Sequence, residues 1–380
     1  MIYFDHASTC MPKPDFIIDA IQSLNKNSTG SPYRSIDQSL KAGNHVEGTR
    51  RSLAKFLGIE QADKLAFTFN ATHGLNTIVK SILKRGDHVI LSCFEHNAVL
   101  RPIHHMVSSQ KDITFSIINS DRNGVFTLDA ITHAIRSNTK LIIWNHASNV
   151  IGSISPVKEI ANIARERKIL MLLDCAQTVG ILDIDLHKLD IDFIAGTCHK
   201  GLLSLPGLGF IYVKDANLID SLIQGGGGYN SHSLNHPSAS PLKFEAGTPN
   251  YFAIASLDKA LEYLRKNRAG HLRRYTRLNE NLIEHLQEIE EVLLYGNTEA
   301  SKKLPITSLN IKNIAPMHLA SMLYKEHQII TRAGVHCAPL AHKVLGTDPM
   351  GCVRVSIGHA NVEADISILV SAIKKIIKRI

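Results

Sequence analysis

The amino-acid sequence predicts an α/β protein, with a large domain around a mostly parallel seven-stranded sheet and a smaller α+β domain beside it. Between about residues 45 and 215, short apolar runs rich in β-branched residues alternate with stretches of helical spacing. The runs are almost continuously apolar, which is typical of parallel strands that helices cover on both faces. After residue 250 the pattern changes to a long helical stretch and a few short strands.

Seven apolar runs have the length and composition expected of buried strands. They cover residues 65–69, 88–92, 113–118, 140–145, 169–174, 193–196 and 209–213. Among them, segment 156–168 has the spacing of an amphipathic helix. Sheets of this type bind ligands outside the carboxyl ends of their strands. The polar residues that directly follow the runs are therefore the candidates for a functional site.

The second half of the chain predicts a different architecture. In order, it contains a helical stretch over roughly 251–294, strands at 307–311 and 352–358, and a closing helix at 361–379. We predict a large ligand-binding domain over residues 16–250. Residues 1–15 and 251–380 are expected to form the small domain.

Composition and charge exclude several classes of protein. The 380 residues carry 42 Lys and Arg against 34 Asp and Glu, a formal net charge of +8. The basic residues are dispersed except for IKKIIKR near the C-terminus, so we expect anionic ligands or an acidic partner and no nucleic acid. No apolar run approaches the ~20 residues that span a bilayer, and MIYFDHAST lacks the features of a secretory signal. The sequence predicts a cytoplasmic protein with no membrane partner.

The cysteines are scattered without Cys-x-x-Cys spacing. They are Cys10, Cys93, Cys175, Cys198, Cys337 and Cys352. In a reducing cytosol this pattern argues against a disulfide framework and against a structural zinc site, and we predict no metal. Most of the six are expected to be small buried hydrophobic residues.

The segment DFIAGTCHKGLLSLPGLGFIYV, residues 192–213, is the most informative one. Lys200 follows a strand and a polar Thr-Cys-His, and a Gly-rich turn then leads into the next strand. A lysine that forms a Schiff base must be held rigidly and partly desolvated, which this position favours. On this segment alone, a merely solvated lysine is the commoner interpretation.

Polar residues at three other strand ends add to this pattern. Asp174 ends the run ILMLLD, where it can pair with a protonated ring nitrogen or simply cap the following turn. Thr72 lies where a helix start can cradle a phosphate with its N–H groups or merely form a capping turn. His96 follows 88–92, where an imidazole can lie over a flat ring or be structural. Together with Lys200, their order along the chain favours the functional interpretation.

In this order and spacing, the segments resemble the class V aminotransferase family of pyridoxal-5′-phosphate (PLP) enzymes, which have PLP-dependent transferase fold type I. Within the family, the sequence is most similar to cysteine desulfurases of the SufS-like group. The resemblance covers nearly the whole chain. It rests on YFDHAST, ATHGLN, EHNAV, HASNVIG, DCAQTVG, TCHKG, FEAGTPN, RAGVHCA and VRVSIGHAN.

The resemblance implies a role toward the cofactor for each matching residue. Lys200 would hold PLP covalently and move the substrate proton, Asp174 would pair with the pyridine nitrogen, and His96 would stack on the ring. Gln177 would contact the phenolic oxygen. The residues expected to contact the phosphate or its surroundings are Thr72, His73, Thr197 and His199. Thr248 in FEAGTPN would reach the phosphate of a neighbouring subunit, which implies a homodimer.

The resemblance also implies a substrate site. Asn149 and Arg354 match positions that hold the substrate carboxylate, and Arg332, which is near Cys337 in sequence, is also expected to bind the substrate. An arginine suits a carboxylate because its planar guanidinium pairs with both carboxylate oxygens. Asn149 is also expected beside the cofactor. The expected substrate is L-cysteine or L-selenocysteine, with a possible acceptor protein for the sulfur.

Cys337 in RAGVHCA decides the predicted reaction type. A desulfurase needs a thiolate that attacks the substrate sulfur and becomes a persulfide, and nearby positive charge helps a cysteine to ionise. We therefore predict a cysteine desulfurase that converts L-cysteine to L-alanine. The alternatives are a selenocysteine lyase, or a class V aminotransferase or PLP lyase that does not use Cys337. In the last case, Cys337 would be an ordinary buried cysteine.

Three departures from the family pattern place the chain in a divergent branch. Cys198 stands in TCHK where SGHK is familiar, and Ser204 and Leu205 replace a more usual Gly-Pro. Val335 stands where SufS-like enzymes often have a second histidine. None of these changes removes a group that PLP chemistry requires.

Overall fold

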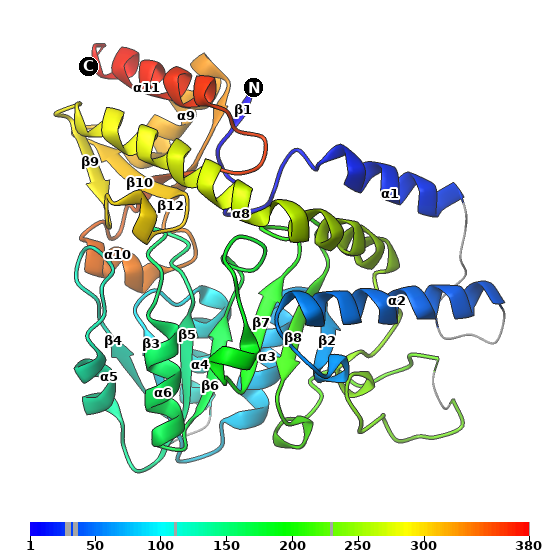
Figure 1. Cartoon of the computed structure of the whole chain (residues 1–380). Coiled ribbons are helices and arrows are strands. Elements are labelled where there is room, and N and C mark those ends of the chain that lie inside the picture. The colour runs from blue at the N-terminus through cyan, green and yellow to red at the C-terminus, as the bar shows by residue number, and fades with distance from the viewer. Residues whose placement is uncertain (27–31, 33–36, 110–111, 229–230, 380) are drawn as a thin grey trace.

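The computed structural model describes residues 1–26, 32, 37–109, 112–228 and 231–379 of the chain (Figure 1). Its described part contains a seven-stranded sheet, a four-stranded sheet and a pair of very short strands. The seven-stranded sheet occupies the lower part of Figure 1, and the four-stranded sheet lies above it near both chain ends.

All seven runs that the sequence predicts as strands form strands, and they belong to one sheet. In spatial order the strands are β2 (Leu65–Thr68), β8 (Gly209–Val213), β7 (Phe193–Thr197), β6 (Leu170–Asp174), β5 (Thr139–Asn145), β3 (His88–Ser92) and β4 (Thr114–Ile118). Within this sheet, β8 runs antiparallel to both of its neighbours. The remaining pairings are parallel. The mostly parallel seven-stranded sheet is thus confirmed.

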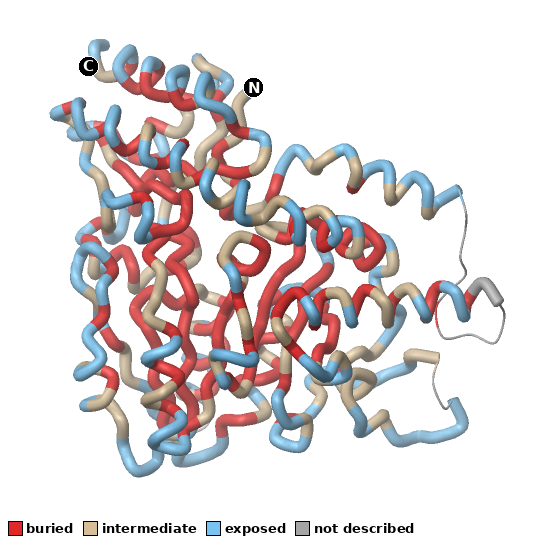
Figure 2. Tube along the Cα trace, in the orientation of Figure 1, coloured by how far each residue is buried: buried red, intermediate tan, exposed pale blue. Residues whose placement is uncertain are grey.

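Helices cover both faces of this sheet because its strands are apolar on both faces (Figure 2). In β3, Val89 and Leu91 pack in one hydrophobic core, whereas Ile90 between them packs in the other. The first core also contains residues of α3 (Ala71–Ile82) and α4 (Asn97–Ser109). The second core contains residues of α2 (Asp37–Phe56), α5 (Leu128–Ala134), α6 (Val157–Glu166) and the first half of α8 (Tyr251–Gln287).

The second sheet is antiparallel. Its order is β12 (Arg332–Gly334), β13 (Cys352–Ser356), β10 (Ile306–Ile311) and β9 (Val292–Tyr295). The second half of α8 packs with α9 (Pro316–His327) and α11 (Glu363–Ile377) in a third core on this sheet. The other elements are β1 (Ile2–Tyr3), which pairs in parallel with β11 (Ile329–Ile330), and the helices α1 (Asp15–Lys26), α7 (Leu186–Leu189) and α10 (Pro339–Leu345).

The long helix ends earlier than the sequence predicts. We expected helical structure to about residue 294, but α8 ends at Gln287 and Val292–Tyr295 forms β9. The prediction was wrong there because pairing with β10, where Leu294 lies opposite Leu309, overrides the local helical pattern. Because α8 runs from the second core into the third, the domain boundary at residues 250 and 251 stays a prediction.

Two further expectations concern burial. Five of the six cysteines are buried, as expected for most of them, and Cys337 is partly exposed. Within the described ranges, none of the helices combines the length and the hydropathy that a bilayer-crossing helix requires.

Candidate active site

A cavity of about 230 Å³ opens at the carboxyl ends of the parallel strands, where the sequence places its candidate residues. Ten of the predicted site residues line it. They are Thr72, His96, Asn149, Asp174, Gln177, Thr197, His199, Lys200, Arg332 and Arg354. The fold thus brings together side chains that are up to 282 positions apart, since Thr72 on α3 and Arg354 on β13 of the second sheet both line the cavity.

Lys200 and Asp174 lie at the ends of neighbouring strands, β7 and β6. Enclosure by the protein lowers the pKa of Lys200 to about 8, and the nearby Asp174 carboxylate partly offsets this effect. Burial raises the pKa of Asp174, while the Ala176 N–H (2.8 Å) and Lys200 act in the opposite direction. At pH 7 roughly a tenth of Lys200 is therefore the neutral amine, far more than for an ordinary lysine, and this is the nucleophilic and basic form.

The loop that carries Lys200 packs tightly against the turn that follows Asp174. The backbone of Gly201 lies so close to the carbonyl oxygen of Val179 that a side chain at position 201 would collide with it. Gly180 in turn has a φ of +87° and lies against Gly201. Glycine is required at both positions because two backbone segments approach each other directly.

His96 lies at the start of α4, directly after the turn that follows β3. Its Nδ1 accepts a hydrogen bond from the Ala98 N–H (3.0 Å), which fixes the ring. Burial, followed by the charge of Lys200, lowers the pKa of His96 to about 4, so the imidazole is neutral near pH 7. A neutral, fixed ring at the edge of the cavity can stack on a planar ligand.

Cys337 does not line the cavity itself, but it lies beside Arg332 and is hydrogen-bonded to Asn97, the residue that follows His96. Its carbonyl accepts a hydrogen bond from the Asn97 N–H (2.7 Å), which ties the cysteine loop to the start of α4. Its Sγ is 3.9 Å from Nη2 of Arg332. Cys337 and His336 both have positive φ angles, 58° and 51°. The partly exposed thiol thus has a guanidinium as its neighbour.

Two arginines face each other across the β12–β13 pair. Arg332 and Arg354 are direct partners in the strand register. Arg354 is 1% exposed, donates to the Asn149 carbonyl (2.8 Å), and forms a 2.5 Å ion pair with Asp5. The Ser8 hydroxyl accepts hydrogen bonds from both arginines, at 2.7 Å and 2.9 Å. Two cations and one nearby carboxylate leave this end of the cavity positive, which suits a carboxylate ligand.

The start of α3 and the end of β7 border the same cavity, through Thr72 and Thr197. The first N–H groups of α3 point out of the helix, and Thr72 lies among them. Thr197 is 2% exposed, and its hydroxyl oxygen has no hydrogen-bond partner among the described residues. His199 contacts the Thr9 hydroxyl at 3.0 Å. An unpaired buried hydroxyl beside a helix N-terminus fits a phosphate, which would supply the missing partner.

His73 and Thr248 lie outside this cavity. The His73 ring stacks on Phe69, with 5.0 Å between the ring centroids, and its backbone N–H donates to the Asn70 cap. His73 and Thr248 line a second, adjoining pocket, and Thr248 is exposed there. The structure therefore does not bring either side chain to the cavity of its own chain.

A buried ion pair holds the segment that carries Thr248. Arg50 is 1% exposed and donates two hydrogen bonds to Glu245, at 2.5 Å and 2.9 Å. The Phe67 N–H of β2 donates to the same carboxylate. The segment around Thr248 is thus fixed to the edge of the large sheet, next to exposed Phe69.

Sequence reasoning gave no role to three side chains at the site. Asp5 and Ser8 come from the motif YFDHAST, which was noted only as part of the resemblance. Glu95 is fully buried and accepts hydrogen bonds from the Ser92 hydroxyl (2.6 Å) and the Asn145 N–H (2.8 Å). Burial raises the pKa of Glu95 to about 8, and Asp174 adds to the rise. Its position directly before His96 was the only available signal.

The three departures from the family pattern all fit the fold. Cys198 is fully buried in the core, and burial raises its thiol pKa far above the ordinary value, so it is inert. The Ser204 hydroxyl donates to the Ala253 carbonyl (2.9 Å), which links the loop after Lys200 to α8. Val335 is exposed next to the cysteine loop.

A mostly parallel sheet with a lysine and a buried aspartate at its carboxyl edge, beside a smaller α+β unit, defines a protein of PLP fold type I. The family model for aminotransferase class V matches residues 2–369, and the chain belongs to that family. A probable cysteine desulfurase from Pyrococcus abyssi is 29% identical, over 100% of this chain and 94% of that protein. A cysteine desulfurase from Salmonella agona is 28% identical, over 99% of this chain and 93% of that protein.

A solved structure of a cysteine desulfurase also resembles this chain over its whole length. The apo structure of cysteine desulfurase from Thermococcus onnurineus NA1 matches with a TM-score of 0.93 and 27% sequence identity. The match covers 100% of this chain and 95% of that chain.

Proposed function

We propose that this protein is a PLP-dependent cysteine desulfurase that converts L-cysteine to L-alanine and takes the sulfur as a persulfide on Cys337. The observation that carries the proposal is the position of Cys337, a partly exposed thiol 3.9 Å from the Arg332 guanidinium and tied to the helix start that carries His96. The relatives from Pyrococcus abyssi and Salmonella agona, which are named as cysteine desulfurases and match over nearly their whole length, support the proposal.

The residues present fit PLP. Thr197, Thr72 and the start of α3 would hold the phosphate, because the buried Thr197 hydroxyl has no partner in the described part of the chain. Asp174 would pair with the ring nitrogen, and His96 would cover the ring. Gln177, which also donates to the Ala7 carbonyl (3.0 Å), lines the same cavity. When bound, PLP supplies an electron sink for the charge that develops at the substrate carbon.

Lys200 attaches the cofactor and acts as the base in this proposal. The neutral amine takes the proton from the substrate Cα at Nζ and later returns a proton to the carbon skeleton that leaves as alanine. Its lowered pKa, about 8, makes this possible near neutral pH. Asp174 keeps the pKa of Lys200 from falling further, because its carboxylate stabilises the protonated amine.

Arg354 orients the substrate by its carboxylate. The buried guanidinium is fixed by Asp5 and by the Asn149 carbonyl, and its Nε has no partner among the described residues. Asn149 donates to the His336 carbonyl (2.8 Å), so the carboxylate site and the loop of Cys337 are joined. A substrate held in this way presents its side chain toward the cysteine loop.

Cys337 removes the sulfur. The Sγ thiolate, which lies next to the Arg332 guanidinium, attacks the substrate sulfur and forms an S–S bond while the carbon–sulfur bond breaks. The electron pair of the broken bond stays with the carbon skeleton, which is then protonated. The persulfide is left on a partly exposed residue, from which an acceptor protein can take the sulfur.

The proposed enzyme belongs to the SufS-like group and acts as a homodimer in the cytoplasm. Thr248 would complete the phosphate site of the partner, since it is exposed and lies away from the cavity of its own chain. Phe69, which is 50% exposed, lines the same pocket as Thr248. Phe252, which is 42% exposed, lies four residues after Thr248 at the start of α8. Exposed apolar side chains of this kind suit a subunit interface. The reducing cytoplasm would keep the six cysteines as thiols.

The proposal is tested by adding L-cysteine to the purified protein and measuring the products. Alanine and persulfide should form in equal amounts, together with a change in the visible absorption of the bound cofactor. Formation of a keto acid without alanine would identify an aminotransferase instead. A higher turnover with L-selenocysteine, independent of Cys337, would identify a selenocysteine lyase.

The dimer has its own test. Sedimentation velocity should show a dimer at assay concentrations, and Thr248→Ala should retain less PLP after gel filtration than wild type while remaining dimeric. Asn235→Ala, in the exposed loop before this segment, is the matched control and should retain PLP fully. A PLP-saturated, fully active monomer would contradict the proposed shared site.

A further inference from the structure

Outside the catalytic cavity, one cluster of side chains has the chemistry of a metal site: His6, Cys10 and His359. We propose that these three residues bind a zinc ion, with a water molecule as the fourth ligand. His6 and Cys10 follow β1 near the N-terminus, and His359 follows β13 near the C-terminus. Nothing in the proposed desulfurase reaction uses them.

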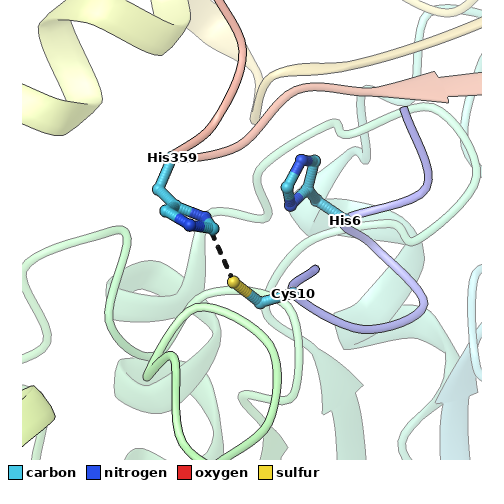
Figure 3. A group of neighbouring side chains, drawn as sticks. All are labelled: His6, Cys10 and His359. Carbon is cyan, nitrogen blue, oxygen red and sulfur yellow. Dashed lines mark hydrogen bonds between the residues drawn. The ribbon is translucent and has the colours of Figure 1, made fainter. Parts of the chain in front are cut away.

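The geometry is that of a preformed ligand set (Figure 3). One ligand atom from each residue lies within 4.8 Å of the others. The Cys10 Sγ is 3.3 Å from Nδ1 of His359. The rings of His6 and His359 are 5.8 Å apart between centroids and nearly perpendicular, at 86°. A tetrahedral zinc ion needs its ligand atoms about 3.3–4 Å apart, so modest rotations of the side chains would complete the site.

An unpaired buried nitrogen is the second observation. His6 is 8% exposed and Cys10 is 3% exposed. The Nε2 atom of His6 is buried and has no hydrogen-bond partner among the described residues. Figure 3 shows the His6 ring beside both other side chains. A buried ring nitrogen without a partner is costly, and a metal ion would satisfy it.

The cluster also borders free space. His6, Cys10 and His359 all line a small cavity of about 40 Å³, which Lys200 and Tyr275 line as well. This volume is large enough for a water molecule, because a cavity needs on the order of 10–15 Å³ to hold one. Three protein ligands and a water are the arrangement of zinc sites that keep one position open.

The ligand types select the metal. A thiolate with two imidazoles suits zinc, whereas the oxygen ligands that magnesium and calcium prefer are missing from the cluster. Binding replaces the thiol proton of Cys10, so one proton is released for each zinc ion bound. The cation nearest in sequence, Lys13, is already held by the carbonyls of His199 (3.1 Å) and Ser204 (2.5 Å).

A bound zinc ion would fasten the N-terminal segment to the chain that follows β13. Ser8 lies between His6 and Cys10, and it contacts both Arg332 and Arg354. The ion would therefore fix the position of the proposed carboxylate site from outside, as a positioning element that does not touch substrate.

A second cluster, formed by His336, His342 and Cys352, serves as the internal comparison. All three of its residues are buried. Two of its ring nitrogens are engaged, because His342 Nδ1 contacts the Thr347 hydroxyl at 2.7 Å and His336 Nε2 contacts the Arg332 carbonyl at 3.2 Å. His342 Nε2 is buried without a partner among the described residues, like His6 Nε2, but this cluster does not line the small cavity that could hold a water ligand. His336 also lines the catalytic cavity. We therefore assign the zinc site to the first cluster.

The experiment measures metal content in the PLP-loaded protein. Protein purified without chelators and then incubated with Zn²⁺ is passed through gel filtration, and zinc per chain is determined by mass spectrometry. About one zinc per chain is expected for wild type. Cys10→Ser and His359→Gln should each reduce zinc retention by on the order of tenfold or more. X-ray absorption of the wild-type zinc should show one sulfur and two imidazole ligands.

Two control variants decide where the zinc lies. Cys337→Ser removes the exposed thiol and Cys352→Ser disrupts the second cluster, and both should keep the wild-type zinc content. Circular dichroism checks that Cys10→Ser and His359→Gln remain folded, and the two variants are independent tests. Zinc below about one tenth per chain in wild type would overturn the proposal. The proposal would also be overturned if Cys337→Ser or Cys352→Ser lost the zinc while Cys10→Ser and His359→Gln retained it.

Discussion

Lys200 occupies a position where two opposing effects set the charge of its amine. Enclosure by the protein lowers its pKa, and the carboxylate of Asp174 on the neighbouring strand raises it. Arg332 and Arg354, which line the same cavity, add to the lowering. The result is an amine whose pKa of about 8 lies close to physiological pH, which suits a group that must both accept and return a proton.

Replacing Lys200 tests this assignment at the residue scale. Lys200→Ala should still bind PLP noncovalently, because the phosphate and ring contacts come from other residues, but turnover should fall by several orders of magnitude. Borohydride treatment of wild type should leave PLP attached to the peptide that contains Lys200. Attachment at another lysine, with Lys200→Ala as active as wild type, would refute the assignment. Lys214→Ala, in the loop after β8, is the control and should keep both properties.

The residue-scale chemistry was predictable where a residue follows an apolar run. Asp174 ends β6, and His96 and Lys200 lie in the turns after β3 and β7, and parallel strands bring their carboxyl ends to one edge. Asp5 and Ser8 were not recognised, because their contact with Arg354 joins positions 349 and 346 apart in sequence. The proximity of Cys10 and His359 was not predictable for the same reason, since they are 349 positions apart and show no local spacing.

At the scale of elements, the close contact between two turns sets the position of Lys200. The turn after β6 and the turn after β7 touch through Gly180 and Gly201. Any side chain at position 201 would push the Lys200 loop away from the Asp174 strand. Ser204 secures the other end of this loop on α8.

Gly201→Ala is therefore expected to displace Lys200. We predict lower PLP occupancy and a stability loss of about 1–3 kcal/mol, because the added methyl group overpacks a backbone contact. Gly270→Ala is the matched control, since a Cβ at that position of α8 meets no atom within 4 Å. Denaturant unfolding and the PLP content of both variants are the measurements. Wild-type occupancy and stability in Gly201→Ala would contradict this account of the loop.

Elements with strong local patterns were predicted well, and elements set by pairing were not. Six of the seven strands of the large sheet are buried along most of their length, and the edge strand β4 is partly exposed, yet all seven form short apolar runs that the sequence identifies. By contrast, β9 is only partly buried, and its strand conformation depends on β10 lying beside it. No local signal distinguishes such an edge strand from the end of a long amphipathic helix.

At the scale of the whole molecule, several buried histidines are neutral in the folded chain. His146 is 8% exposed, and burial lowers its pKa to about 4. His96 and His199 behave in the same way, each with a pKa of about 4. In the unfolded chain these rings protonate near pH 6.5, so unfolding takes up protons below that pH. The stability that the neutral histidines confer is present above pH 6.5 and is lost as pH falls toward 4.

The acid sensitivity can be measured on one histidine. Between about pH 7.5 and pH 5, wild type should lose on the order of 2 kcal/mol more unfolding free energy than His146→Asn, because the variant has no proton to take up there. His104→Asn, an exposed substitution on α4, should behave like wild type. Equal pH dependence of wild type and His146→Asn would show that His146 does not contribute to the acid sensitivity.

The central claim, that Cys337 is the residue that takes the sulfur, is tested most directly by comparing alanine production by wild type and Cys337→Ala. The variant should bind PLP normally and respond spectroscopically to L-cysteine, since Lys200, Asp174 and Arg354 are intact. It should form alanine slower by several orders of magnitude, because the covalent nucleophile is missing. In wild type, mass spectrometry should find one extra sulfur on the Cys337 peptide. If Cys337→Ala releases alanine from L-cysteine as fast as wild type, Cys337 is structural and the protein is another class V PLP enzyme.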